Sequence, residues 1–285
     1  MKRFWLSIAI LGAFVLTGCR LGNKEAAETE QDTTAADTMA VVVDPDTLLL
    51  DEEVKAGMVS ASMDELFDDF IFGFDQSNRL QRERTRWPLT SVGKDGQRRQ
   101  IAREEWQHHY VFMGQDFAMV FWSNAAEMDL PSDTTLCNAS VEQIYLHSRE
   151  IHDYHFQRDT LTGKWMLEAV EVHAFEEHEL CDFLDFYGKW ATDSLFQREH
   201  VTTPLRYTMT DDDAGQTVSG TIDVDQWFTF APMLPRDVIT NVRYGQVYAH
   251  TPRLIMQMRE PGSGMQTTFT FHRQGDTWRL TALEE

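Results

Sequence analysis

The hydrophobic residues that follow Ser62 recur at the spacing of an α-helix. The apolar side chains that fall on one face of a helix with 3.6 residues per turn are Leu66, Phe67, Phe70, Ile71 and Phe74. Ser62 and Glu65 have the spacing of a capping box, in which side chains satisfy free backbone N–H groups at a helix start. The pattern therefore predicts a helix that begins at Ser62 and ends near residues 79–82.

The pattern changes further along the chain. Trp106 and Tyr110 are four residues apart, which predicts a second short helix at residues 103–112. Beyond this point, continuous or alternating apolar residues predict strands. The expected strands are residues 117–122, residues 141–156 as one long strand with a bulge, and residues 165–172.

The stretch from Phe67 to Leu89 returns later in the chain, without a gap, from Phe183 to Leu205. Both copies begin with aromatic residues at helical spacing, carry Gln-Arg-Glu and end on Pro-Leu. We therefore expect two copies of one module, at residues 61–178 and 179–285. Residues shared by the copies are expected to be scaffold, because both copies need a core while a site needs only one.

The second copy is expected to repeat the order of the first. Its helix is predicted at residues 183–190, and its strands at residues 201–208, 238–247, 253–258, 267–271 and 278–283, with a strand or short helix at residues 221–230. A helix followed by long antiparallel strands is typical of an α+β protein. In such a protein a curved sheet wraps around helices.

The first residues form a targeting segment rather than part of the fold. Lys2 and Arg3 precede an apolar run that is too short to span a membrane, which takes about 20 residues, and that suits a signal peptide at residues 1–18. The residues before Cys19, Leu-Thr-Gly, resemble the lipobox of bacterial lipoproteins. The resemblance implies lipidation of Cys19 and, because Arg20 follows it, sorting to the outer membrane, facing the periplasm or the cell surface.

A polar segment follows the lipobox. Residues 19–60 are poor in aromatic residues and rich in Ala, Thr, Glu and Asp, a composition that predicts a flexible tether. The chain has a formal net charge of -21, which argues against nucleic acid as a partner, since phosphate binding needs clustered Lys and Arg. Because of the lipid anchor, we expect the membrane to be one partner. A small ligand, an envelope protein and a second copy of the chain are the other candidates.

The element order is similar to that of a known family. A leading aromatic helix, a Pro-Leu strand, a middle helix and a last strand that begins with Trp resemble the cone-shaped, cystatin-like α+β fold of nuclear transport factor two, shared by ketosteroid isomerase. Two such units behind a lipobox are similar to a group of Bacteroides-type lipoproteins of unknown function. The resemblance implies two tandem cone-shaped domains, each a curved antiparallel sheet wrapped around helices. It carries over no catalytic residue and no cofactor.

An isomerase of this fold needs a carboxylate base at the mouth of the cone and acids inside it that stabilise an oxyanion, as in the worked example of ketosteroid isomerase. Each module offers one weak set of candidates. These sets are Asp116 with Tyr110 and Tyr145 in the first module, and Asp225 with Tyr244 and Tyr248 in the second. Neither set has a diagnostic spacing, and tyrosines in strands are commonly packing residues with a hydroxyl at the rim.

Histidines gather between residues 147 and 155. On a strand, His147, Asp153 and His155 share one parity, so a metal-ligand set is conceivable, but no accepted ligand spacing is present. We therefore predict exposed strand histidines and no metal.

Two arginines and two cysteines complete the candidates. Arg82 and Arg198, from the repeated Gln-Arg-Glu, could each bind an anionic group or tie a carboxylate. Cys137 and Cys181 could form a disulfide between the modules in an oxidising compartment, although the sequence does not show that they are close.

The leading functional hypothesis is an envelope-anchored lipoprotein that binds a ligand or a protein without catalysis. An isomerase or dehydratase that uses one cone pocket, and a structural dimerisation module, are the alternatives. They differ in one observable feature: an enclosed pocket with a buried acid at its floor favours the enzyme.

Overall fold

The structure is a computed structural model that describes residues 63–285, except residues 114, 116, 212–215, 249–250 and 260–265. All described residues belong to one compact unit of the chain. The predicted signal peptide, the tether, the capping residue Ser62 and the candidate base Asp116 lie outside the described residues.

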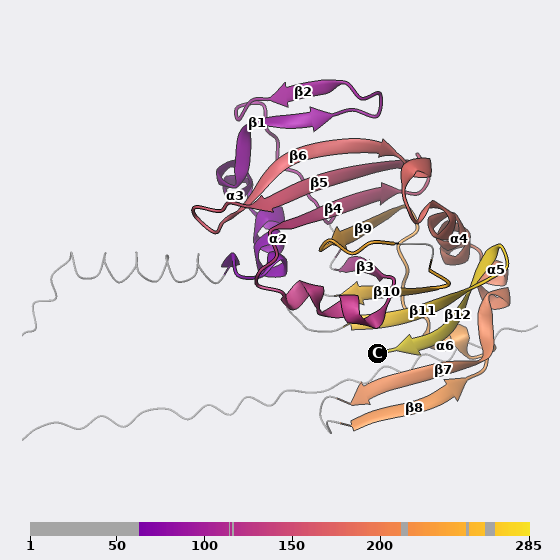
Figure 1. The fold of residues 1–285 in the computed structure, drawn as a ribbon. Coiled ribbons are helices and arrows are strands. Elements are labelled where there is room, and N and C mark those ends of the chain that lie inside the picture. The colour runs from indigo at the N-terminus through magenta and orange to yellow at the C-terminus, as the bar shows by residue number, and fades with distance from the viewer. Residues whose placement is uncertain (1–62, 114, 116, 212–215, 249–250, 260–265) are drawn as a thin grey trace, which may run out of the picture. The chain divides into compact units, whose positions relative to one another are not determined.

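Within the described residues, twelve strands form one sheet (Figure 1). The first half of the described chain, residues 63–178, contributes β1 (Thr85–Val92), β2 (Arg98–Ile101), β3 (Ala118–Trp122), β4 (Asn138–Tyr145), β5 (Glu150–Arg158) and β6 (Trp165–Ala174). The second half, residues 179–285, contributes β7 (Val201–Asp211), β8 (Gln216–Ile222), β9 (Val238–Arg243), β10 (Arg253–Arg259), β11 (Gln266–Gln274) and β12 (Thr277–Glu284).

In the described part of the chain, two short helices precede the strands of each half, and a single helical turn lies between β8 and β9. They are α2 (Phe67–Gln76) and α3 (Asn78–Glu83) in the first half, and α4 (Cys181–Thr192), α5 (Ser194–Glu199) and the single turn α6 (Trp227–Phe230) in the second. Two 3-10 helices, η1 (Ala125–Ser132) and η2 (Phe175–Glu177), lie in connections. The protein is therefore a mixed α+β protein with a large sheet and few helices, as predicted. Among the described residues, no helix is both long and apolar enough to cross a membrane.

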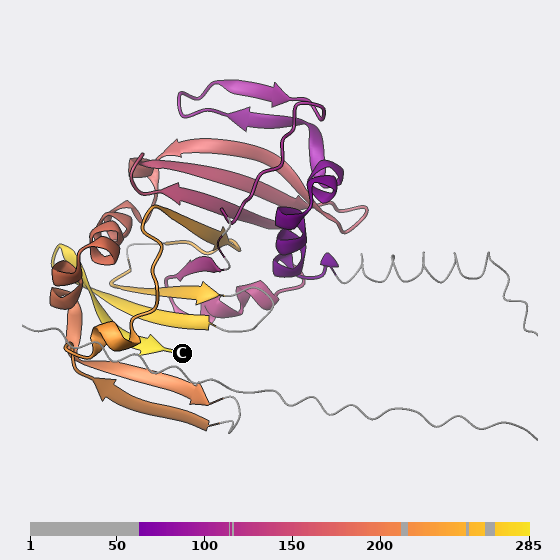
Figure 2. The same cartoon turned by 180° about the vertical axis from the view of Figure 1, so that it is seen from behind.

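The two halves pair their strands in the same way, and at the centre of the sheet each half pairs with a strand of the other. β1 pairs antiparallel with β2 and parallel with β6, and β7 pairs in the same manner with β8 and β12. The sheet order is β2-β1-β6-β5-β4-β9-β3-β10-β11-β12-β7-β8. Figure 2 shows the same sheet from behind, with the β1–β2 pair at one end and the β7–β8 pair at the other. At the centre, β9 of the second half lies beside β4, and β3 of the first half lies beside β10.

Two aromatic cores lie along the sheet, one around α2 and one around α4. The first contains Phe67, Phe70, Phe74, Phe156 and Trp165, and the second contains Phe183, Trp190, Trp227, Phe271 and Trp278. Each core also takes side chains from the other half. Val242, Tyr244 and Ile255 enter the first core, whereas Met119, Phe121, Ile144 and Ile151 enter the second.

The leading helix differs from the sequence prediction. It is divided into α2 and α3 at Ser77, whose backbone is extended and whose hydroxyl accepts a hydrogen bond from Leu80 N at 3.2 Å. Ser77 thus caps a new helix. The apolar stripe ends at Phe74, and Leu80 is the only apolar residue between it and Trp87, so the hydrophobic pattern carried no signal for the break.

The other differences concern segments that the sequence assigned to regular elements. Residues 103–112 form turns and irregular structure, not the predicted middle helix. Residues 141–156 are not one strand but the hairpin of β4 and β5, in which Arg149 adopts a φ of 54° at the turn. The last predicted residues of 238–247 leave the sheet, since β9 ends at Arg243.

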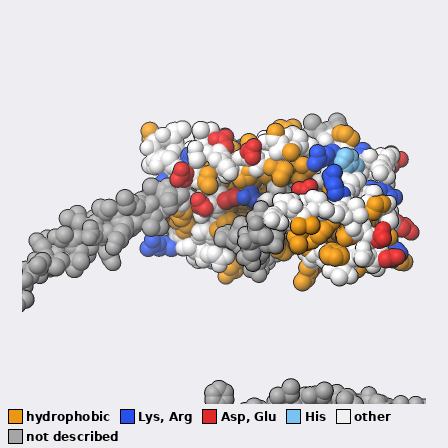
Figure 3. All heavy atoms as spheres, turned by 90° about the horizontal axis from the view of Figure 1, so that it is seen from below, with side chains coloured by type: hydrophobic (Ala, Val, Ile, Leu, Met, Phe, Trp, Pro, Cys, Tyr) orange, Lys and Arg blue, Asp and Glu red, His pale blue; other side chains and the backbone are white. Residues whose placement is uncertain are grey.

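The end of the sheet that carries β7 and β8 exposes large apolar side chains. Met209 and Val218 lie on these strands, and Phe228, Phe230 and Met233 lie in and after α6. Figure 3 views the molecule from below and shows hydrophobic side chains gathered in several groups among charged ones.

Candidate ligand-binding pocket

A pocket of about 560 Å³ opens where the irregular segment 106–113 meets β4 and β5. Its lining is aromatic and polar, and eight residues form it. They are His108, His109, Tyr110, Met113, Gln143, Tyr145, His152 and Tyr154. We call this the Tyr/His pocket.

The strand residues of the Tyr/His pocket share the face of the sheet that packs against α2. Gln143 is paired with His152, and Val141 with Tyr154, so these four side chains point to the same side. Phe156 follows two residues after Tyr154 on that side and packs against Phe67, Phe70 and Phe74 of α2. The pocket therefore lies next to the first core on the same face of the sheet, and it begins where the aromatic side chains of that core end.

Gln143 connects the strands to the opposite wall of the pocket. Its side-chain nitrogen donates hydrogen bonds to the carbonyls of Tyr110 and Val111, at 2.9 and 3.0 Å. Its side-chain oxygen accepts from the hydroxyls of Tyr145 and Tyr154, at 3.1 and 3.4 Å. This buried amide thus forms hydrogen bonds to groups on both walls of the pocket, and the geometry of the pocket depends on it.

Gln81, from α3, supports the wall of the pocket that is formed by the irregular segment 106–113. Its nitrogen donates to the carbonyls of Phe74 and His109, at 3.0 and 2.7 Å, and its oxygen accepts from Trp106 Nε1 and His109 N, both at 3.1 Å. Because side chains satisfy these backbone groups, the segment needs no helical hydrogen bonds of its own. This explains why residues 103–112 are irregular.

Arg82 supports the same wall. Its guanidinium donates to the carbonyls of Arg103 and Trp106, both at 2.7 Å, and to Asn78 Oδ1 at 3.0 Å. The repeated Gln-Arg pair of the first half is therefore scaffold for the pocket wall. Arg198, its counterpart in the second half, forms an ion pair with Asp225. Both guanidinium groups thus bind the chain itself.

The pocket favours neutral side chains. Burial lowers the pKa of His109, and the neighbouring His108 and His152 lower it further. Burial also lowers the pKa of His152 and raises the pKa of Tyr145 and Tyr154. Each of these shifts favours the uncharged form at neutral pH. Among the described residues that line the pocket there is no carboxylate, so its chemistry is hydrogen bonding and aromatic contact.

The first set of candidate catalytic residues is partly brought together. Tyr110 and Tyr145 both line the Tyr/His pocket, as the set requires, while Asp116 lies outside the described residues. Tyr110 is 56% exposed and stacks on His108 with ring centroids 4.5 Å apart. The hydroxyl of Tyr145 bonds to Gln143, which the sequence reasoning did not select.

The second set is not brought together. The side chain of Asp225 is 75% exposed and pairs with Arg198. Tyr244 is buried elsewhere, where its hydroxyl donates to Asp68 and accepts from Arg259. Tyr248 accepts hydrogen bonds from Asn241 at 3.2 Å and Gln246 at 3.3 Å. In the second half, Trp227 packs on Trp190 with ring centroids 5.9 Å apart, within the aromatic core.

The structure also places the remaining candidates. Cys137 and Cys181 are both free thiols, the first exposed before β4 and the second half-buried at the start of α4, so the considered disulfide is not formed. His147 is exposed and lies 3.0 Å from Asp237 Oδ1 rather than beside Asp153 and His155.

The centre of the pocket was not predicted from the sequence. Gln143 stands among apolar residues of a predicted strand, on the inward parity shared by Val141. A polar residue at such a position is the one local signal that could have marked it. His152 was noted only as one of several clustered strand histidines, because its position opposite Gln143 depends on the hairpin register.

Comparison with known proteins places this fold in a group. Residues 46–285 match the family model described as a domain of unknown function, DUF4348. The chain is similar to the crystal structure of an NTF2-like protein from Bacteroides fragilis NCTC 9343, with a TM-score of 0.72 and 35% sequence identity. The match covers 78% of this chain and 96% of that one. No curated protein matches the chain.

Proposed function

This chain belongs to the DUF4348 family and has an NTF2-like α+β fold, and from that premise we propose that it is an envelope-anchored lipoprotein whose Tyr/His pocket binds a small uncharged ligand without catalysis. The observation that carries the proposal is the pocket itself. It is open, has a volume of about 560 Å³ and is lined by tyrosines, histidines and Gln143. That volume lies in the range of small-molecule sites.

The lining defines the chemistry of the ligand. Stacked Tyr110 and His108 offer flat aromatic surfaces, and lowered histidine pKa values keep His109 and His152 neutral at pH 7. A neutral imidazole has one donor and one acceptor nitrogen, so it can bind either a hydroxyl or a carbonyl. We expect a planar, largely apolar molecule with one or two hydrogen-bonding groups.

The preference for binding over catalysis rests on the same residues. The polar groups at the pocket centre already satisfy one another, since Gln143 bonds to both tyrosine hydroxyls. Among the described lining residues there is no carboxylate, which an isomerase of the ketosteroid type uses as its base. A ligand recovered from the protein after prolonged incubation should therefore be chemically unchanged, as mass spectrometry can show.

The binding test uses Nile red, an uncharged planar dye, titrated into the purified chain and followed by fluorescence. Replacing His152 with Trp fills the pocket and should weaken the dye at least tenfold, which corresponds to about 1.4 kcal/mol. Val247→Trp adds the same bulk at an exposed position outside the lining and serves as the matched control. Equal affinity of both variants for the dye would refute the pocket as the binding site.

The anchor is the second part of the proposal. A lipobox at residues 16–19 supports lipidation of Cys19 and attachment to the outer membrane through residues 19–60. Cys19→Ser should move the protein from the membrane fraction to the soluble fraction, while Cys137→Ser should leave it in the membrane. Retention of Cys19→Ser in the membrane would contradict the anchor. An envelope-protein partner and a homodimer stay predictions.

The architecture supports a third proposal, that the unit arose from two copies of one cone-shaped module, at residues 61–178 and 179–285. In support, α2-α3 and α4-α5 precede strands with matching pairings in both halves. Phe67 and Phe183 hold equivalent positions, each in edge-to-face contact with a tryptophan, at centroid distances of 5.0 and 5.3 Å.

A further inference from the structure

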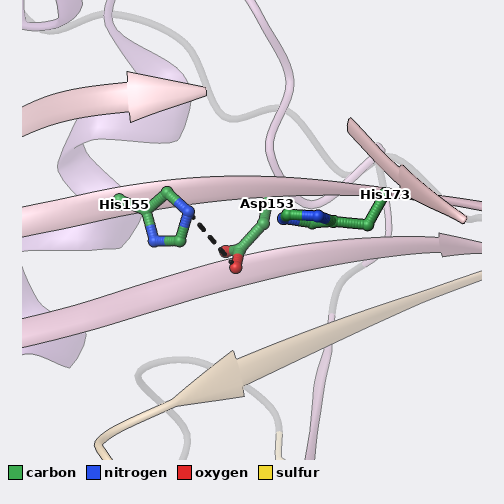
Figure 4. A group of neighbouring side chains, drawn as sticks. All are labelled: Asp153, His155 and His173. Carbon is green, nitrogen blue, oxygen red and sulfur yellow. Dashed lines mark ion pairs between the residues drawn. The ribbon is translucent and has the colours of Figure 1, made fainter. Parts of the chain in front are cut away.

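Four metal-ligating side chains meet on the face of β5 and β6 that points away from the Tyr/His pocket. Asp153 and Glu171 are directly paired across the two strands. His155 lies two residues beyond Asp153 on β5, and His173 two residues beyond Glu171 on β6, so all four share one face. Figure 4 shows Asp153 between His155 and His173.

The separations of the ligand atoms match those around a metal ion. His155 Nε2 lies 3.5 Å from Asp153 Oδ2 and 3.7 Å from Glu171 Oε2, and His173 Nε2 lies 3.5 Å from Glu171 Oε2. Asp153, His155 and His173 each offer one ligand atom, and these three atoms all lie within 4.8 Å of one another. Ligand atoms about 2.1 Å from a tetrahedral Zn²⁺ are separated by about 3.4 Å.

Hydrogen bonding within the protein does not explain this arrangement. Asp153 Oδ1 and His155 Nε2 are buried atoms with no hydrogen-bond partner among the described residues. Asp153 is 7% exposed, and separations of 3.5 and 3.7 Å are too long for an N–H···O hydrogen bond. Buried polar atoms are nearly always satisfied, so two unpartnered atoms on neighbouring side chains indicate a missing ligand.

The donor set indicates the kind of ligand. Two imidazoles and two carboxylates carry two negative charges when the histidines are neutral, which a divalent cation would balance. Mixed nitrogen and oxygen donors at tetrahedral separations favour Zn²⁺ over Mg²⁺ and Ca²⁺, which prefer oxygen donors only.

The site is reached from solvent. Asp153 and His155 line a second pocket, of about 580 Å³, together with Gln246 and Val247. We propose that Asp153, His155, Glu171 and His173 bind one Zn²⁺ ion, which Asp153 and His155 place at the edge of this second pocket. The site is separate from the Tyr/His pocket, because neighbouring residues of β5 point to opposite faces, and it does not rest on the proposed function.

The test is Zn²⁺ binding by the full chain, purified without a histidine tag and freed of metal with a chelator. Calorimetric titration with ZnCl2 and elemental analysis after dialysis should both give one ion per chain. Co²⁺ in place of Zn²⁺ should give the visible absorption of a tetrahedral complex, a readout that needs no activity.

Matched variants locate the ion. His155→Ala and His173→Ala each remove one donor and should weaken Zn²⁺ at least about tenfold. His147→Ala removes an exposed histidine whose partner is Asp237 and should leave the affinity unchanged. Since His155 and His173 are about two-fifths exposed, with side-chain exposures of 39% and 41%, the variants should stay folded, which circular dichroism checks.

Two results would overturn the assignment. One is the absence of stoichiometric Zn²⁺ in the wild-type chain. The other is equal affinity of His155→Ala, His173→Ala and His147→Ala for Zn²⁺, which would place the ion elsewhere. Nile red binding should be unchanged in all three variants, so the zinc site and the ligand pocket can fail independently.

Discussion

Trp122 donates a hydrogen bond from its indole nitrogen to the side-chain oxygen of Gln257, over 2.7 Å, with both side chains buried. Trp122 ends β3 in the first half, whereas Gln257 lies in β10 of the second. The pairing of β4 with β9, and of β3 with β10, means that each half supplies a central strand to the other. The two halves are thus joined by backbone pairing, by mixed cores and by this polar contact.

The Trp122–Gln257 contact should be energetically coupled. Trp122→Phe leaves the Gln257 oxygen, and Gln257→Leu the Trp122 indole nitrogen, without a partner, at a cost of about 1–3 kcal/mol each. Gln257→Leu also removes the hydrogen bond to Thr268 Oγ1, in the single and the double variant alike. The double variant removes both groups and should cost less than the sum of the single changes, by about 1 kcal/mol. Urea unfolding of the four proteins measures this, and strict additivity would show that the hydrogen bond contributes nothing.

A buried ion pair at the start of the first half should contribute far more than an exposed one nearby. Arg84 binds Asp64 through two hydrogen bonds of 2.7 and 2.8 Å, and both side chains are less than 10% exposed. Arg84→Met leaves Asp64 buried without its cation and should cost about 3–5 kcal/mol.

The matched control for that change is Arg79→Met. Arg79 pairs with Glu83 over 3.4 Å, but its side chain is 86% exposed, so its loss should cost less than about 1 kcal/mol. Urea unfolding compares the two variants. Similar losses in both would contradict the assigned burial of Arg84.

Much of the strand content could be predicted from the sequence, whereas the pairing could not. Residues 253–258 contain a short apolar run, Leu254 to Met256, and residues 278–282 alternate between apolar and polar; the two segments are found in β10 and β12. The run at residues 117–122 is apolar on both faces, as its buried strand β3 confirms, and for that reason it carries no signal for which neighbour it joins. Its place beside β10 is set by tertiary packing.

The candidate site was predictable only in part for the same reason. Tyr110 and Tyr145 were candidates for the acids inside a cone, with Asp116 as the base, and both tyrosines line the Tyr/His pocket. They are linked through Gln143, and this link depends on the register of the hairpin. It also depends on the irregular segment 106–113, where the local periodicity predicts a helix. His173 was not considered as a metal ligand, because only the pairing of β5 with β6 brings it beside Asp153.

Gln81 should be essential to the pocket wall. Gln81→Leu removes the partners of His109 N, His109 O, Phe74 O and Trp106 Nε1, and buried unpaired groups cost about 1–3 kcal/mol each. We expect a loss of at least about 2 kcal/mol in urea unfolding and weaker Nile red binding.

Gln197 holds the equivalent place in α5 and is the control for Gln81. Its side chain has no hydrogen bond to any described residue, although it is only 7% exposed. Gln197→Leu should therefore cost less stability and leave the dye affinity unchanged. If Gln197→Leu alone lost dye binding, the dye site would lie in the second half and not in the Tyr/His pocket.

His109 should make the fold less stable as the pH falls. Its pKa in the folded state is lowered, mainly by burial, so below about pH 6.5 the unfolded chain binds the proton more readily than the folded chain. Stability from this residue is complete above the unfolded pKa and declines as the pH drops toward the folded one. His109→Asn should flatten the loss of unfolding free energy between about pH 7 and pH 5, and an unchanged slope would contradict the shift. A histidine titration by NMR gives the folded pKa directly.

Cutting the chain between residues 178 and 179 should produce two fragments that need each other. The fragment 61–178 lacks Val242, Tyr244 and Ile255 of its core, and the fragment 179–285 lacks Met119 and Phe121. Each also loses the central strand that the other half supplies, which leaves an unpaired sheet edge. We expect poor near-ultraviolet circular dichroism for each fragment alone, and a native spectrum and co-elution on size exclusion after mixing. If each fragment instead folds as a monomer, the shared strands do not join the halves, because a separate core would then suffice for each.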